Sequence, residues 1–266
     1  MTSRAPRALV EVAPGVLVAT ARRYTTTSTA VVGDDAGCLL VDPALTEAEL
    51  RGLAAALQGR GLRVVAAFST HPHWDHLLWH PALGQVPRWA TARAAAVARA
   101  HAAELREQAA DEAPGLALEG LLALPDGAGH VPWTGPPTAV VAHDAHAPGH
   151  AAVLARGVLV AGDMLSDLEV PLLDLSAADP LGEYSTGLDR LAAALRRNDL
   201  RVVVPGHGRP TDRDGALARL DADRRYLDAL AAGRPLDANQ DARLADPWTR
   251  GEHERQVRAL RPLGSG

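Results

Sequence analysis

The hydrophobic pattern of the first seventy residues predicts short strands, one helix and a further strand. Four apolar runs are separated by the turn sequences "APG" and "GDDAG", which is typical of β-strands. "TEAELRGLAAALQGRG" then repeats leucine on one helical face and begins with a capping-box pair, Thr46 and Glu49. The apolar run "RVVAAFST" follows as a buried strand and leads directly into a histidine-rich segment.

The rest of the chain repeats this order of strands and helices. Residues 91–113 are rich in Ala, Arg and Glu but poor in large apolar residues, which predicts a solvent-facing helix or lid rather than a core helix. "AAVLA" and "VLVAG" predict two strands joined by a two-residue hairpin at Arg156-Gly157. A helix, the strand "RVVV" and a mainly helical C-terminal third follow. Two packed sheets covered by helices are the simplest arrangement of such a pattern.

The chain is long enough to bury a sizeable core, with 266 residues of which 47 % are hydrophobic. This composition excludes a wholly disordered chain. We expect one domain over residues 1–266, with a helical insertion at about 91–137 and a helical C-terminal region at about 211–266.

Charge and residue usage exclude several classes of partner and mechanism. A net charge of −5 argues against nucleic-acid binding, and no apolar run is long enough for a signal peptide or a membrane span. The single cysteine, Cys38, cannot form an internal disulfide. All 27 basic residues are arginine, which indicates a GC-rich bacterial genome and excludes mechanisms based on lysine. We therefore expect a cytoplasmic protein that acts on a small molecule and binds neither membrane nor nucleic acid, while the oligomeric state stays open.

The segment "STHPHWDHLLWH" at residues 69–80 has the spacing of a metal site. Pro72 keeps the preceding chain extended, so the side chains of His71 and His73 point the same way and can bind one ion. The chain must then turn, which directs Asp75 and His76 to a neighbouring position. Imidazole and carboxylate ligands favour zinc, iron or manganese over calcium or magnesium.

Three later strand ends carry side chains of the same kind. "VVAHDAHAPGH" offers His143, His146 and His150, whereas "VLVAGDML" and "RVVVPGHG" offer Asp163 and His207. Polar side chains at strand ends are found where a fold builds its pockets. His80, by contrast, is expected to be an ordinary, partly buried histidine.

Taken in order, "THPHWDH", "HAPGH", "GDML" and "VPGHG" resemble the motifs of the metallo-β-lactamase superfamily over roughly residues 8–210, and "THPHWDH" is similar to glyoxalase II. The resemblance implies an α/β fold, the αβ/βα four-layer sandwich, in which two mixed β-sheets are flanked by helices. It also implies a dinuclear metal site, with two Zn²⁺ expected and Fe or Mn possible.

The resemblance further implies a role for each matching residue. One metal would be held by His71, His73 and His146, the other by Asp75, His76 and His207, with Asp163 bridging the two. Asp42, at the end of "CLLVD", would support the histidine loop, and His150 would support or pack against the ligands without binding metal.

Departures from known branches of the family narrow the function. Asp163 replaces the cysteine of the main two-zinc β-lactamases, and Ser166 replaces the tyrosine of the acyl-homoserine lactonases. "LLWH" stands where glyoxalase II has small residues, and His73 stands where the flavo-di-iron proteins have glutamate. Trp89, Trp133, His130 and Tyr184 are candidate pocket-lining residues, although packed or rim positions suit them better.

The leading hypothesis is a two-metal hydrolase acting on an ester, lactone, thioester or amide carbonyl. Paired ions lower the pKa of water towards about 7, and Asp75 is the residue expected to orient that water and to pass a proton to the leaving group. The alternatives are a mononuclear-iron sulfur or persulfide dioxygenase, a phosphodiesterase, or a metal-binding scaffold without catalysis.

Overall fold

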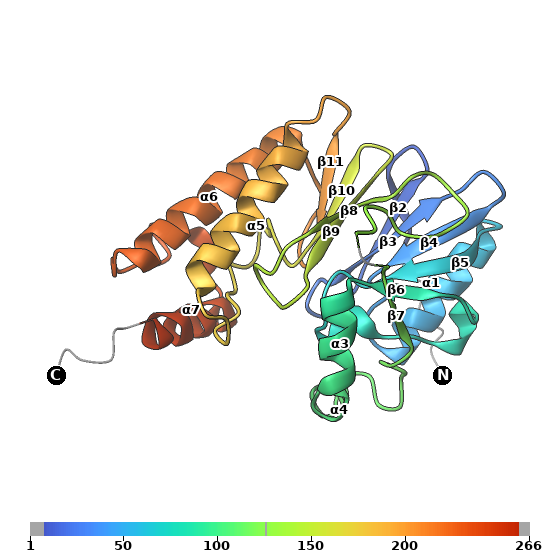
Figure 1. The fold of residues 1–266 in the computed structure, drawn as a ribbon, viewed down its shortest axis with the longest axis horizontal. Helices are drawn as coiled ribbons and strands as arrows, with labels where there is room; N and C mark the ends of the chain where they lie inside the picture. The colour runs from blue at the N-terminus through green and yellow to red at the C-terminus, as the bar shows by residue number, and fades with distance from the viewer. Residues whose placement is uncertain (1–7, 126, 261–266) are drawn as a thin grey trace.

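Two β-sheets lie face to face between layers of helices in the computed structural model, which describes residues 8–125 and 127–260 (Figure 1). Helices α5, α6 and α7 lie on one outer side and α1, α3 and α4 on the other. This order of layers confirms the predicted αβ/βα sandwich. The two ends of the expected domain, residues 1–7 and 261–266, lie outside the described residues.

The first sheet has seven strands in the order β1-β2-β3-β4-β5-β6-β7. The pairs from β1 to β4 are antiparallel and those from β4 to β7 are parallel, so the sheet is mixed. Its strands are β1 (Val10–Ala13), β2 (Val16–Thr20), β3 (Thr27–Val32), β4 (Gly37–Val41), β5 (Arg63–Phe68), β6 (Arg88–Ala90) and β7 (Leu121–Ala123).

The second sheet has five strands in the order β12-β11-β10-β9-β8, of which only the β10–β11 pair is parallel. The predicted hairpin at Arg156-Gly157 joins β9 to β10, and both of these residues have positive φ. The strands are β8 (Ala139–Ala142), β9 (Ala151–Ala155), β10 (Val158–Gly162), β11 (Val202–Pro205) and β12 (Thr211–Asp212).

The helices cover the outer faces of the sheets. The capping box of Thr46 and Glu49 begins the first helix, as the sequence predicts. The helices are α1 (Glu47–Gly59), α2 (Trp74–Leu77), α3 (Ala92–Ala100), α4 (Ala102–Ala109), α5 (Pro180–Leu195), α6 (Arg213–Ala231) and α7 (Pro247–Ala259), with 3₁₀ turns at Pro81–Leu83 and Ala242–Ala245.

Three large apolar clusters fill the spaces between the four layers, and a small fourth one joins β6 to α3. The central cluster packs valines of both sheets around Phe68. A second cluster joins the first sheet to α1, where Leu50, Leu53 and Leu57 are buried. The third joins the second sheet to α5 and α6 and encloses Tyr184. Tyr184 is therefore a core residue and does not line a pocket.

The predicted helical insertion at 91–137 is helical only as far as Ala109. After Pro114 the chain forms loops and the short strand β7, which pairs in parallel with β6 and so extends the first sheet. Helices α3 and α4 face solvent, as expected, because most of their residues are exposed. Five residues on their inner side are buried, namely Ala94, Ala95, Ala98, Leu105 and Ala109, and the small alanines let the helices approach their neighbours closely.

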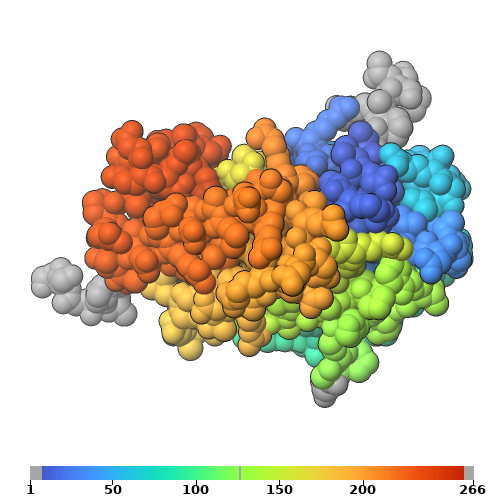
Figure 2. Space-filling view, turned by 90° about the horizontal axis from the view of Figure 1, so that it is seen from above, coloured from blue at the N-terminus to red at the C-terminus, as the bar shows by residue number. Residues whose placement is uncertain are grey.

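The C-terminal region is helical in α6 and α7, and residues 232–241 between them form an irregular connection. In Figure 2 the red-orange portion of this part of the chain lies at the end of the molecule away from the blue N-terminal strands, whereas the orange portion before it borders them. None of the helices within the described residues has the length and apolar character needed to cross a membrane.

Candidate metal centre

The loops that carry the predicted ligands meet at one edge of the two sheets. Backbone hydrogen bonds connect these loops across the sandwich, from Ala151 N to Thr70 O at 2.8 Å and from Thr27 N to Gly206 O at 2.7 Å. The N-cap side chain of α3, Thr91, donates to Gly149 O at 2.6 Å and so supports the loop between β8 and β9. The site is thus built from both sheets and is not confined to the histidine-rich segment.

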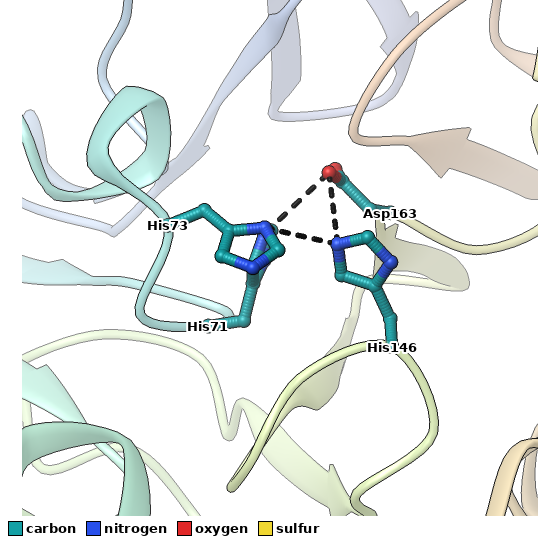
Figure 3. A group of neighbouring side chains, drawn as sticks. All are labelled: His71, His73, His146 and Asp163. Carbon is teal, nitrogen blue, oxygen red and sulfur yellow. Dashed lines mark hydrogen bonds and ion pairs between the residues drawn. The ribbon is translucent and has the colours of Figure 1, made fainter. Parts of the chain in front are cut away.

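The first ligand group consists of His71, His73, His146 and Asp163, whose nearest ligand atoms all lie within 4.8 Å of one another (Figure 3). His146 Nε2 lies 3.0 Å from His73 Nδ1. Asp163 Oδ2 lies 3.5 Å from Nε2 of both His71 and His146. Three imidazoles and one carboxylate oxygen therefore surround a single point.

The second ligand group consists of Asp75, His76 and His207. The two imidazole Nε2 atoms lie 3.4 Å apart, and Asp75 Oδ2 lies 3.5 Å from His76 Nε2 and 3.3 Å from His207 Nε2. All three residues are buried, and the single turn of α2 carries Asp75 and His76 next to each other.

Asp163 lies between the two groups. Its Oδ1 is 3.1 Å from His76 Nε2, and its Oδ2 is 3.3 Å from His207 Nε2 as well as facing the first group. Gly206 makes this approach possible, because a Cβ atom at that position would lie 1.9 Å from Asp163 Oδ1. The structure thus places Asp163 where the family resemblance expects a bridging residue.

The spacing of the donor atoms fits metal ligation. Two ligand atoms bound to one tetrahedral zinc lie about 3.3 Å apart, given zinc–nitrogen distances of about 2.0–2.1 Å. The distances between individual pairs of ligand atoms given above range from 3.0 to 3.5 Å and so include that value. In addition, the buried atoms His71 Nε2 and Asp163 Oδ1 make no hydrogen bond within the protein. A bound cation would give both atoms a partner.

The remaining ring nitrogens are fixed by acceptors outside the ligand groups. Nδ1 of His146 donates to Leu172 O at 2.9 Å, and Nδ1 of His207 donates to Tyr24 O at 2.8 Å. Since a carbonyl can only accept, each neutral ring keeps its Nε2 lone pair directed into the centre. The same argument holds for His76, whose Nδ1 lies 3.0 Å from Asp42 Oδ2.

Asp42 supports the histidine loop by three contacts. Its Oδ1 accepts from Thr70 N at 2.8 Å, and its Oδ2 accepts from Thr70 Oγ1 at 2.6 Å in addition to facing His76. Thr70 Oγ1 then faces His71 Nδ1 at 2.9 Å. Asp42 has positive φ, as do Tyr24, Thr25 and Leu165, so four of the six such non-glycine residues in the described chain surround the centre.

The pKa values of the imidazoles are shifted in opposite directions in the two ligand groups. Burial lowers the pKa of His71, of His73 and, to about 3, of His146, so these rings are neutral and ready to bind a cation at pH 7. For His76 and His207 burial acts in the same direction, but the nearby carboxylates, above all Asp163, outweigh it and raise the pKa. In the metal-free protein the carboxylates therefore favour the protonated form of His76 and His207, and a bound cation would take the place of that proton.

His150 lies against the first group without reaching its centre. Its ring stacks on His71, with centroids 5.0 Å apart, and on His143 at 4.5 Å, and neither of its ring nitrogens makes a hydrogen bond. Gly162 allows this packing, since a Cβ atom there would lie 2.4 Å from His150 Nε2. His150 is thus placed where it packs against a ligand, as the sequence predicts.

His80 and the candidate rim residues lie apart from the ligand groups. His80 Nδ1 accepts from Ala82 N at 3.0 Å and begins the first 3₁₀ turn. Trp89 and Trp133 pack against the cluster between the sheets. His130 is exposed and forms a β-bridge with Ala139.

Sequence reasoning missed Glu169, a half-buried residue on the loop after Asp163. Burial raises the pKa of its carboxyl to about 7. The charges that act on it are those of the centre: His207, Asp163, Asp75 and His76. A glutamate on a loop without a motif gives no signal in the sequence, and neither do the carbonyls of Tyr24 and Leu172 that hold the imidazoles.

Known proteins match both the sequence and the fold. Residues 22–207 match the model of the metallo-beta-lactamase superfamily. A beta-lactamase domain protein from Burkholderia ambifaria has a similar crystal structure, with a TM-score of 0.69 and 23 % identity over 97 % of this chain and 90 % of that one. No curated protein matches the sequence.

Two further crystal structures are metallo beta lactamases, from Hirschia baltica and from Erythrobacter litoralis with beta mercaptoethanol in its active site. Both give a TM-score of 0.57 at 20 % identity. They cover 81 % and 82 % of this chain and 97 % and 96 % of their own chains. At such identities these structures establish the fold and leave the substrate open.

Proposed function

Because this chain belongs to the metallo-β-lactamase superfamily, we propose that it is a metal-dependent hydrolase with two divalent ions, zinc in the first instance, held by the two ligand groups. The observation that carries the proposal is the position of Asp163 between two complete sets of donors, each within 4.8 Å. The substrate is a small molecule with an ester, lactone, thioester or amide carbonyl.

The chemistry of the donor set supports zinc, iron or manganese. Imidazole nitrogen combined with carboxylate oxygen suits these ions, whereas calcium and magnesium prefer oxygen ligands alone. When bound, paired ions would lower the pKa of water towards about 7 and polarise the carbonyl of the substrate. No cysteine, serine or lysine nucleophile is needed for such a reaction.

Asp75 performs the proton handling in this proposal. Burial alone would raise the pKa of its carboxyl, but the neighbouring His76 and His207 outweigh that effect and lower it. The carboxylate is therefore ionised at neutral pH and can accept a hydrogen bond from the attacking water, which orients it. As the water attacks the carbonyl, the carboxylate would accept the proton that the water loses and then pass that same proton to the leaving group.

The direct test combines metal analysis with a substrate panel. Zinc-loaded and chelator-stripped protein would be assayed on chromogenic esters, lactones and thioesters, with zinc measured by mass spectrometry. We expect about two zinc ions per chain and hydrolysis only in the loaded form. One iron per chain with oxygen consumption on a persulfide would instead support the mononuclear dioxygenase, whereas hydrolysis of phosphodiesters alone would support the phosphodiesterase.

The role of Asp75 is tested by Asp75→Asn, which keeps one oxygen available as a ligand. We expect kcat to fall by about 10²–10⁴-fold while part of the bound zinc is retained. Full activity in this variant would contradict the assigned role. Metal binding without turnover of any substrate would favour the non-catalytic scaffold.

A further inference from the structure

The loop that follows Asp163 contacts both ligand groups although it has no regular secondary structure. We call residues 163–173 the bridging loop. Its Leu172 O accepts from His146, and its Ser166 Oγ donates to His207 O at 2.9 Å. An irregular segment that holds the imidazole of His146 and the backbone of His207 needs support from elsewhere in the fold, because loops without such support are mobile.

Gln256 of α7 supplies this support at the end of the loop that faces His146. Its side chain is fully buried, with 0 % exposure. Its Oε1 accepts from Leu173 N at 2.7 Å, and its Nε2 donates to Pro171 O at 3.0 Å. The carboxamide therefore bonds the backbone on both sides of Leu172.

The peptide group between Leu172 and Leu173 links Gln256 to His146. The N–H of Leu173 and the C=O of Leu172 belong to one planar trans unit and point in opposite directions. Gln256 holds the N–H side, and His146 Nδ1 donates to the C=O side at 2.9 Å. The peptide is thus the middle of a hydrogen-bonded series whose members polarise one another.

Two further residues fix the orientation of the carboxamide itself. Tyr226 Oη accepts from Gln256 Nε2 at 3.0 Å and lies 3.0 Å from His253 Nδ1. Pro171 O can only accept and Leu173 N can only donate, so flipping the amide would break both backbone bonds. The side chain has one satisfied orientation.

We propose that Gln256 is a positioning residue for the metal centre, which acts through the Leu172–Leu173 peptide to orient His146 and to set the metal affinity of the first ligand group. The inference rests on the proposed metal-dependent function. It assigns a role in that function to a residue beyond residues 22–207, the part of the chain that matches the family.

The test compares Gln256→Leu with Thr249→Val as a matched control. Thr249 is a buried residue of the same helix, and its Oγ1 donates at 3.4 Å to Leu168 O, on the same loop but away from His146. Zinc affinities would be measured by competition with a chromophoric chelator. We expect Gln256→Leu to weaken one of the two affinities by about 10–100-fold, and Thr249→Val to leave both unchanged.

A conservative variant separates positioning from a general loss of structure. Burial at this position favours a protonated Glu, and in Gln256→Glu such a carboxyl keeps both an acceptor for Leu173 N and a donor for Pro171 O, so we expect it to recover most of the affinity that Gln256→Leu loses. Thermal unfolding would be recorded for every variant. Equal weakening of both affinities, no weakening in Gln256→Leu, or no recovery in Gln256→Glu would each overturn the proposal.

A spectroscopic readout decides the inference independently of the proposed function. Nitrogen NMR of the histidine side chains in the metal-free protein reports whether the proton of His146 sits on Nδ1. We expect this signal in the wild type and in Thr249→Val, and its loss or shift in Gln256→Leu. If the wild type binds no divalent ion, the proposed function fails, while an unchanged His146 signal in Gln256→Leu overturns the role of Gln256.

Discussion

In the N-terminal half of the molecule, four candidate ligands lie within residues 71–76, and the carboxylate of Asp42 supports them from the neighbouring strand end. In the C-terminal half, His146, Asp163 and His207 come from three separate loops. The bridging loop contacts His146 and His207. It is held by Arg243, Thr249 and Gln256, which follow the last strand of the second sheet in the sequence.

This contrast shows two ways to position a metal ligand. The N-terminal ligands depend on one buried carboxylate inside the region that matches the family. Among the C-terminal ligands, His207 depends on the carbonyl of Tyr24, and His146 depends on the carbonyl of Leu172, whose peptide group is held in turn by Gln256 of α7. A change in the helical C-terminal region can therefore affect the metal centre although it lies outside the family match.

The largest expected effect comes from removing Asp163, which lies between the two ligand groups. Asp163→Ala takes the bridging carboxylate from both ligand groups, so we expect hydrolysis to fall by about a thousandfold or more, equivalent to several kcal/mol. The measurement is kcat/KM on the best substrate together with zinc content. Asp174→Ala is the control, because its carboxylate bonds Ser176 and no ligand; equal activity in both variants would contradict the shared role.

A large effect on stability is expected at the buried ion pair that holds the middle of the bridging loop. Arg243 Nη1 lies 2.6 Å from Asp223 Oδ1 and also donates to Glu169 O at 3.0 Å. Arg243→Met leaves the buried carboxyl of Asp223 without its charged partner, so we expect the free energy of unfolding to fall by about 3–5 kcal/mol. Urea denaturation measures this change.

The double variant Arg243→Met/Asp223→Leu is the control for that prediction. It removes the buried carboxyl of Asp223, so part of the lost stability should return, while Asp241 still lacks its bonds to Arg243. If the double variant is no more stable than the single one, the cost does not arise from the unpaired carboxylate.

A smaller effect is expected at the corresponding support in the N-terminal half. Asp42→Asn weakens the acceptor that faces His76 Nδ1. It also weakens the acceptor of Thr70 Oγ1, the hydroxyl that faces His71 Nδ1. We expect both zinc affinities to fall by about 10–100-fold, in contrast to the single affinity affected by Gln256→Leu. A change in only one affinity would show that Asp42 serves one group.

The smallest effect is expected at the last histidine of the segment 69–80. His80 caps a 3₁₀ turn, so His80→Ala should lower the free energy of unfolding by about 1 kcal/mol or less and leave zinc content and activity unchanged. Denaturation and metal analysis of one preparation check both statements. Loss of zinc in this variant would mean that His80 belongs to the centre.

The sequence predicts the layers and the convergence of the candidate ligands because both leave local signals. Strand ends are visible as apolar runs, and His71 to His76 have a spacing that few other structures use. The packing of α3 could not be predicted, because alanine is compatible with an exposed helix and with a tightly packed one. The carbonyls of Tyr24 and Leu172 could not be predicted either, since every residue has a carbonyl and only the fold selects which of them faces a ligand.

The position of Gln256 has a consequence for the synthesis of the protein. All seven candidate ligands precede Gln256 in the sequence, and His207, the last of them, precedes it by 49 residues (256 − 207). A ribosome adds about 5–20 residues per second, so the nascent chain carries every ligand for about 2–10 s before it contains the residue that fixes His146. A zinc ion captured in that interval meets donors whose final geometry is set only when α7 docks.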